Sequence, residues 1–218
     1  MATDEKLNIY FDTEFTGLDR DTDLISIGLS TNDGTWFYGE LTDYDHSKID
    51  RWLQDHVINN LLLDDYPKIY TEELHMPSAP GHYHIKIKGD KAYIREELLK
   101  WLENESKLAG GKQIQMISDC YAYDWMLFID LICEDGKALS LPKFIYYIPL
   151  DLSTMLSDHG YDPDVSREAF AAKKYSEKIN YIKSCNVFNN TYKNIKHNSL
   201  WDAFIIVICH HRLTHENE

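Results

Sequence analysis

Two acidic residues, Asp12 and Glu14, interrupt a segment that otherwise has the composition of a buried strand, "LNIYFDTEF" at residues 7–15. Residues two apart in a strand point to the same face, so the two carboxylates should project side by side. Carboxylates this close repel each other, and each raises the pKa of the other unless a cation lies between them. Oxygen ligands of this kind favour Mg²⁺ or Mn²⁺. Taken alone, the pair would also fit a strand end whose acids simply reach water.

Two further acids lie in apolar surroundings, where solvation alone does not explain them. Asp124 stands at the start of the apolar segment "YAYDWMLFIDLI", and Asp202 stands in "HNSLWDAFIIVICHH" between Trp201 and Ala203. An aspartate at the start of a helix can also have a purely structural role, because its negative charge stabilises the positive end of the helix dipole. That explanation suits Asp124 better than Asp202, so the four acids together favour a metal site.

Three motifs that contain these acids resemble those of a known family. "FDTEFTG", "AYDWMLF" and "HNSLWDA" occur in the same order as the three motifs of the DEDDh 3′-to-5′ exonucleases, which have the ribonuclease-H-like fold. The family signature ends in His-x4-Asp, and His197, "NSLW" and Asp202 match that spacing. The motifs span residues 9–210, and "DTEFTG" followed by "LISIGL" is similar in particular to bacterial and phage 3′-to-5′ exoribonucleases.

The resemblance implies two Mg²⁺ or Mn²⁺ ions per active site. Asp12 would bridge both ions, Glu14 and Asp202 would complete the ligands of the first, and Asp124 would hold the second, through water. One metal lowers the pKa of a water that becomes the nucleophile, and the other stabilises charge on the leaving 3′ oxygen. His197 would be the general base, since the unperturbed pKa of histidine lies nearest neutral pH.

The resemblance also implies where the substrate binds. Phe15, Thr16 and Leu18 would lie against the terminal nucleotide, with Leu18 favoured over Phe15 as the apolar wedge on the last base. The net charge of the chain is −14, yet residues 167–196 hold seven basic side chains against two acidic ones. Lys193 and Lys196 are the predicted contacts to a single-stranded nucleic acid in this segment. A solvated helix face is the alternative interpretation.

The remaining pattern predicts an α/β class with a ribonuclease-H-like, mixed five-stranded sheet flanked by helices. Residues 7–15, 24–31 and 35–41 are expected to form a three-stranded antiparallel meander, because "NDG" between the last two is typical of a hairpin. Parallel strands should follow at 114–118 and 144–152. The predicted helices cover residues 47–63, 95–106, 122–133, a short stretch ending near Gly160, the segment from Arg167, and 199–213. One domain over residues 1–218 is expected, with an irregular insertion at 64–92 that contains a short ribbon.

Composition excludes several other classes of protein. The chain has no basic and apolar leader and no apolar run of ~20 residues, so a membrane protein is not expected and a cytoplasmic location is. Its four cysteines lie far apart without a CxxC pair, which favours thiols over a zinc site or disulfides.

The sequence therefore predicts a hydrolase, a metal-dependent 3′-to-5′ exonuclease that acts on RNA or single-stranded DNA and releases nucleoside 5′-monophosphates. An exoribonuclease is favoured. The alternatives are a proofreading-type DNA exonuclease, a short-oligonucleotide hydrolase, an endonuclease on the same fold, and a catalytically silent nucleic-acid-binding module. The preferred nucleic acid, its length, the biological pathway and the oligomeric state stay open, although similar bacterial proteins are often homodimers.

Overall fold

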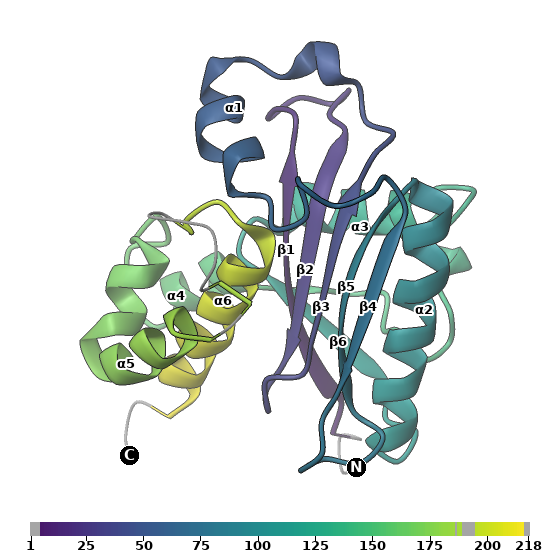
Figure 1. The fold of residues 1–218 in the computed structure, drawn as a ribbon. Coiled ribbons are helices and arrows are strands. Elements are labelled where there is room, and N and C mark those ends of the chain that lie inside the picture. Colours follow the sequence, from purple (N-terminus) through teal and green to yellow (C-terminus); the bar gives the residue numbers. More distant parts are fainter. Residues whose placement is uncertain (1–4, 186, 189–194, 216–218) are drawn as a thin grey trace.

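The computed structural model describes residues 5–185, 187–188 and 195–215. A mixed seven-stranded sheet forms the centre of this part of the chain, with the strand order β4-β5-β3-β2-β1-β6-β7. Helices α2 and α3 pack on one face of the sheet and α4, α5 and α6 on the other (Figure 1). The predicted α/β class is confirmed, and the arrangement is consistent with a ribonuclease-H-like fold.

The bounds of the elements follow the chain in order. The strands are β1 Leu7–Phe15, β2 Leu24–Thr31, β3 Trp36–Leu41, β4 Tyr70–His75, β5 Tyr83–Gly89, β6 Ile114–Ser118 and β7 Leu150–Asp151. The α-helices are α1 Arg51–His56, α2 Lys91–Leu108, α3 Tyr121–Ile132, α4 Leu152–Asp158, α5 Arg167–Lys183 and α6 Ser199–Thr214. Among the described residues, no helix is both long enough and apolar enough to cross a membrane.

The first three strands form the predicted antiparallel meander, and β6 and β7 add to it in parallel. The predicted strand at residues 144–152 is mostly not paired as a strand. Ile145 makes one bridge to Ile114, and only Leu150 and Asp151 form a ladder with β6. Pro149 interrupts this segment, and its ring nitrogen has no N–H to donate to a neighbouring strand.

The sheet has two strands more than the five that were predicted. Both of them, β4 and β5, lie in residues 64–92, where an irregular insertion was expected. The ribbon expected there is the antiparallel pair β4 and β5, and β5 joins the sheet by pairing in parallel with β3. The alternating pattern of β5 explains this, because Ile85 and Ile87 are buried against α2. Of the turn residues that suggested irregularity, Pro67 precedes the ribbon, and Pro77, Pro80 and Gly81 lie in the connection between its two strands.

The predicted helix at residues 47–63 is broken into three short pieces. A 3₁₀ turn at His46–Lys48 precedes α1, and a second one at Ile58–Asn60 follows it. The helix begins after Asp50 rather than at residue 47, because the Asp50 side chain accepts a hydrogen bond from the amide of Leu53. This broken segment covers the end of the sheet at which β1 terminates (Figure 1).

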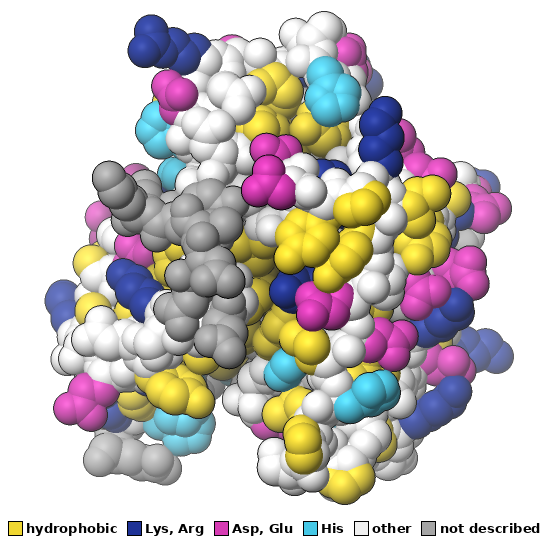
Figure 2. Space-filling view, viewed as in Figure 1, with side chains coloured by type: hydrophobic (Ala, Val, Ile, Leu, Met, Phe, Trp, Pro, Cys, Tyr) yellow, Lys and Arg dark blue, Asp and Glu magenta, His cyan; other side chains and the backbone are white. Residues whose placement is uncertain are grey.

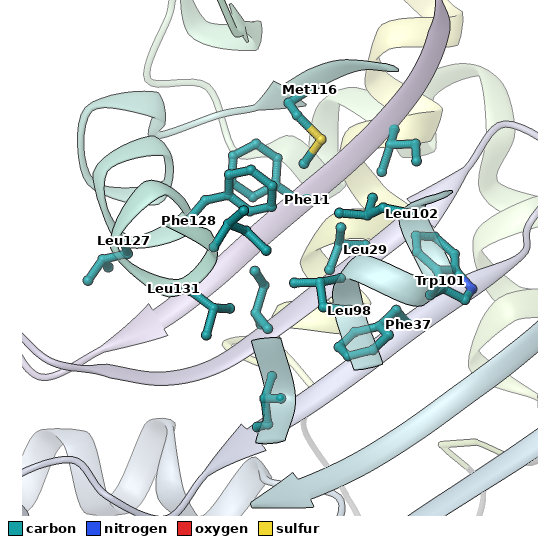
Figure 3. Close-up of a cluster of buried hydrophobic side chains, with 14 of the residues drawn as sticks. Phe11, Leu29, Phe37, Leu98, Trp101, Leu102, Met116, Leu127, Phe128 and Leu131 are labelled. Atoms are coloured by element: carbon teal, nitrogen blue, oxygen red, sulfur yellow. The ribbon is translucent and has the colours of Figure 1, made fainter. Parts of the chain in front are cut away.

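Strand alternation divides β1 between two cores. Ile9 and Phe11 point into the larger core, where the residues labelled in Figure 3 pack between the sheet, α2 and α3. Tyr10 points into the opposite core under α6. Asp12 and Glu14 continue the Tyr10 side of the alternation, so their carboxylates face the start of α6.

The backbone of helix α6 packs directly against Gly28 of β2. A Cβ atom at this position would lie 2.3 Å from the backbone nitrogen of Leu200 and the carbonyl carbon of Ser199. The Gly28→Ala protein should therefore lose about 3 kcal/mol of unfolding free energy or more in a urea titration. Gly39→Ala is the matched control, because its added methyl meets only side-chain atoms, from 3.1 Å outward. Equal stability of the two variants would contradict this close packing.

His210 of α6 makes stability depend on pH. Its Nδ1 lies 2.9 Å from the Tyr10 hydroxyl, and burial lowers the pKa of the imidazole from 6.5 to about 4. The unfolded chain therefore binds a proton before the folded one does. The contribution of His210 is complete above pH 6.5 and is lost as the pH falls toward 4, by at most ~3 kcal/mol. Urea titrations across this pH range should show a smaller loss of unfolding free energy for His210→Gln than for wild type. If the unfolding free energies of the two proteins fall in parallel, the assignment is contradicted.

Candidate active site

One cleft of about 770 Å³ brings together all five residues that the motifs single out. Asp12 and Glu14 come from the end of β1, and Asp124 comes from the first turn of α3. Asp202 comes from the first turn of α6, and His197 from the loop before it. Segments from the beginning, middle and end of the chain thus meet at the end of the sheet where β1 terminates.

The side chains fall into two groups of possible metal ligands. Ligand atoms of Glu14, His197 and Asp202 all lie within 4.8 Å of one another. Ligand atoms of Asp12, Asp119 and Asp124 form the second group, within the same limit. Carboxylate oxygens dominate both groups, and this donor set suits Mg²⁺ or Mn²⁺.

Burial and mutual repulsion raise the pKa of every predicted acid in the cleft. Burial is the largest cause at Asp12, Glu14 and Asp202, and the charges of neighbouring carboxylates add to it. The pKa of Asp124 is raised to about 8, by burial first and then by the charge of Asp119. The ionised cluster is therefore unfavourable on its own, and a cation among the oxygens would offset this cost.

Asp124 is held in place by β1 and by its own helix. Its Oδ1 accepts hydrogen bonds from the backbone nitrogen of Thr13 at 3.2 Å and from the Thr13 hydroxyl at 2.6 Å. Its Oδ2 accepts one from the backbone nitrogen of Cys120 at 3.3 Å. Thr13 lies between Asp12 and Glu14 and points to the opposite face, so the same strand supplies two acids and fixes a third.

His197 has a left-handed backbone conformation, with φ of 60°. Its backbone N–H donates to Oδ2 of Asp202 at 3.1 Å, so the main chain of the histidine fixes this carboxylate. Burial lowers the pKa of the imidazole, and the charges of Lys196 and His56 lower it further. The ring is therefore neutral at pH 7 and can accept a proton at a nitrogen.

Two buried asparagines that the motif analysis missed hold the loop before α6. The Asn60 side-chain amide donates to the carbonyl of Lys196 at 2.8 Å, and the Asn198 amide donates to the carbonyl of Asn60 at 2.9 Å. Asn198 also caps α6 by accepting from the amide of Trp201. The two amides therefore fix His197 against the segment after α1.

Asp119 is a further acid that the sequence analysis missed. It directly follows β6, which pairs in parallel with β1, so the carboxyl ends of both strands lie at the same end of the sheet. The Arg167 guanidinium holds its Oδ2 at 3.1 Å and also donates to the Ser153 hydroxyl at 2.6 Å. The position of Asp119 after a buried strand that pairs with β1 could have identified it.

The predicted substrate residues have different environments. Leu18 is 72% exposed and lines the cleft, as does Lys196. Phe15 is half-buried and stacks on Tyr123 with ring centroids 5.4 Å apart, and the buried Thr16 hydroxyl accepts from the amide of Asp23. Lys193 lies outside the residues that the structure describes.

A second cleft, of about 630 Å³, lies away from the acids, between the sheet and helices α5 and α6. Hydrophobic side chains such as Trp36, Phe204 and Val207 form much of its lining. Figure 2 looks onto this side of the molecule and shows exposed hydrophobic side chains along it. The two groups of possible metal ligands do not extend into this cleft.

Comparison of the chain with protein-family models gives no match, and comparison with curated proteins gives none either. The chemistry of the site is therefore inferred from its own residues and from the motifs that they form.

Proposed function

We propose that this chain is a metal-dependent 3′-to-5′ exonuclease that hydrolyses RNA or single-stranded DNA and releases nucleoside 5′-monophosphates. The observation that carries the proposal is the convergence of Asp12, Glu14, Asp124 and Asp202 with His197 in one cleft. Burial makes ionisation of these acids costly, and two divalent cations would make the same arrangement favourable. Exoribonuclease activity is the favoured form, on the resemblance of "DTEFTG" and "LISIGL".

The residues present fit two ions of Mg²⁺ or Mn²⁺. Asp12 would contribute to both, Glu14 and Asp202 to the first, and Asp124 to the second, with Asp119 available beside it. Such ions lower the pKa of a water and stabilise charge on a leaving oxygen. Hydrogen bonds from Thr13 and from the backbone of His197 orient two of the carboxylates before any ion binds.

The histidine supplies the proton transfer. A water oxygen adds to the phosphorus of the last phosphodiester, and a neutral ring nitrogen of His197 takes the proton that the water loses. The bond between the phosphorus and the 3′ oxygen of the preceding nucleotide breaks, and this oxygen takes a proton from solvent. The products are a nucleoside 5′-monophosphate and a strand shorter by one nucleotide with a free 3′ hydroxyl.

A panel of labelled substrates tests the proposal. Wild-type protein with Mg²⁺ or Mn²⁺ should shorten linear single strands from the 3′ end, and a chelator should stop the reaction. Circular single strands should stay intact, because they offer no 3′ end, whereas an endonuclease would open them. Matched RNA, DNA and dinucleotide substrates separate an exoribonuclease from a DNA exonuclease and from a short-oligonucleotide hydrolase.

A catalytically silent binding module on the same fold is the alternative from outside the enzymes. The residue types argue against it, since the cleft holds every acid and the histidine that the motifs require. Calorimetric titration with Mn²⁺ separates the two: the enzyme should bind the ion, and a module that lost its catalytic metals should not.

A further inference from the structure

Glu40 of β3 is the most deeply buried carboxyl group among the described residues outside the acidic cleft, at 1% exposure. It alternates with Trp36 and Tyr38 along the strand, so it lies on the face of the sheet that packs against α6. Burial raises the pKa of its carboxyl group. A buried acid costs stability unless its contacts offset the loss of water, and the proposed reaction does not use this one. The groups around Glu40 therefore have to account for its presence.

The hydrogen bonds around Glu40 can run in only one direction. The backbone N–H of Leu63 donates to its Oε1 at 2.8 Å, and the Tyr38 hydroxyl lies 2.8 Å from the same oxygen. This hydroxyl also lies 3.3 Å from the backbone nitrogen of Leu62 and 3.3 Å from the side-chain nitrogen of Asn198. Both nitrogens are donors only. The hydroxyl therefore accepts from them and donates its own proton to Glu40.

Glu40 and Lys88 hold the segment after α1 from two sides. Oε2 of Glu40 has no hydrogen-bond partner among the described residues, and the Lys88 ammonium lies 4.0 Å from it. The ammonium donates instead to the carbonyls of Leu63 at 2.6 Å and Asp64 at 3.3 Å. The acid thus fixes an amide of this segment and the lysine fixes its carbonyls.

Two asparagines extend this set of hydrogen bonds to the loop before α6. The Asn198 amide that donates to the Tyr38 hydroxyl also donates to the carbonyl of Asn60. The Asn60 amide in turn donates to the carbonyl of Lys196. Asn198 and Asn60 are both buried, so each of these donors would lose stability without its acceptor. The Tyr38 hydroxyl therefore helps to fix the loop.

One peptide group joins these hydrogen bonds to the acidic cleft. The carbonyl of Lys196 and the N–H of His197 belong to the same planar group. The carbonyl accepts from Asn60, and the N–H donates to Oδ2 of Asp202 at 3.1 Å. Rotation of this group would break both bonds and would change the left-handed backbone of His197, with φ of 60°. Such a conformation is uncommon outside glycine and persists where surrounding contacts hold it.

We propose that Tyr38 and Glu40 are positioning residues of the active site. The Glu40 carboxylate orients the Tyr38 hydroxyl as an acceptor for Asn198, and the loop thus held places the His197 ring and its N–H at the acids. Neither Tyr38 nor Glu40 lines the cleft, so the pair acts on the reaction only through the loop. The inference rests on the proposed function for the chemistry of His197, but not for the conformation of the loop.

Tyr38→Phe protein tests the proposal, because it loses the hydroxyl and keeps the buried ring. With Mn²⁺ and a single-stranded substrate, kcat should fall roughly 10-fold and KM should stay within about twofold, since no group that lines the cleft is removed. Tyr10→Phe is the matched control. Tyr10 is buried on the same face of the sheet, but its hydroxyl contacts Asn32 and His210. Equal kcat values for the two variants would overturn the proposal.

Two substitutions of Glu40 separate its role as an acceptor from its bulk. Glu40→Gln keeps a carbonyl oxygen for Tyr38 and should keep kcat within about threefold of wild type, whereas Glu40→Leu should lose at least as much as Tyr38→Phe. Equal losses in Glu40→Gln and Glu40→Leu would contradict positioning by this hydrogen bond. If Glu40→Leu does not fold, the comparison of Tyr38→Phe with Tyr10→Phe decides.

Hydrogen exchange at the His197 amide tests the positioning without turnover. In Tyr38→Phe this amide should exchange roughly 10-fold faster than in wild type or Tyr10→Phe, because the loop opens more often. Faster exchange in a protein without nuclease activity would support the positioning and refute the exonuclease. Metal-dependent nuclease activity with unchanged exchange and unchanged kcat in Tyr38→Phe would support the exonuclease and overturn the positioning.

Discussion

Asp12→Asn protein should lose nuclease activity and gain stability when no metal is present. Asp12 is the acid that would contribute to both ions, so the variant should be slower by about 10³-fold or more, equivalent to several kcal/mol of transition-state stabilisation. The same carboxylate is buried among other acids, which raise its pKa. Removing its charge should raise the unfolding free energy at pH 7 by about 1 to 3 kcal/mol in a chelator.

The sign of the stability effect follows from the direction of the pKa shift. A carboxyl group whose pKa is raised by folding favours the folded state at low pH, and this contribution is lost as the pH rises through the folded pKa. In a chelator, the unfolding free energy of wild-type protein should therefore be lowered at pH 7. Addition of Mn²⁺ should raise it by more in wild type than in Asp12→Asn. Urea titrations with and without Mn²⁺ measure both effects.

Asp158→Asn provides the matched control, because Asp158 is an exposed acid at the end of α4. It removes the same charge from the chain and should leave both the activity and the response to Mn²⁺ unchanged. If Asp12→Asn keeps full metal-dependent activity, or is less stable than wild type in chelator, the acidic cluster is not a catalytic metal site.

His197→Asn protein should bind Mn²⁺ normally and turn over ~10²- to 10⁴-fold more slowly. Asparagine tolerates the left-handed backbone of this position, and the backbone N–H that donates to Asp202 is kept. The lowered pKa of His197 keeps the ring neutral at pH 7. Activity of wild type should thus fall on the acidic side as the ring protonates, and this limb of the pH profile should disappear in the variant.

Calorimetry with Mn²⁺ distinguishes a base from a ligand at this position. Retained affinity together with a large fall in kcat supports proton transfer by His197. A large loss of Mn²⁺ affinity in His197→Asn would instead make the histidine a metal ligand, which its distance to Glu14 and Asp202 also permits.

Local pattern was sufficient to predict the centre of the fold and to single out the four acids, whereas His197 was added by the resemblance of the motifs; all five residues line one cleft. Alternation along β1 puts Asp12 and Glu14 on one face, and the "NDG" turn fixes the meander. The α/β class followed from the order of the elements. The roles of these residues and the presence of metal remain predictions, since they concern ions and substrate that bind to the chain.

Other features depended on contacts between distant parts of the chain. Strands β4 and β5 were missed as sheet strands because turn residues surround them, and only the pairing of β5 with β3 shows that they complete the sheet. Asp119 could be recognised as a site residue only from its contact with the Arg167 guanidinium and from the nearby carboxylate of Asp124. Asn60 acts through a loop 136 residues away, which no local pattern could indicate.

The most direct test of the central claim is a time course of single-stranded RNA and DNA, linear or circular, with Mg²⁺ and wild-type or Asp12→Asn protein. We expect stepwise shortening of linear strands from the 3′ end with release of nucleoside 5′-monophosphates, intact circles, and no reaction in a chelator or with Asp12→Asn. Opened circles, shortening from the 5′ end, or equal activity of the two proteins would contradict it.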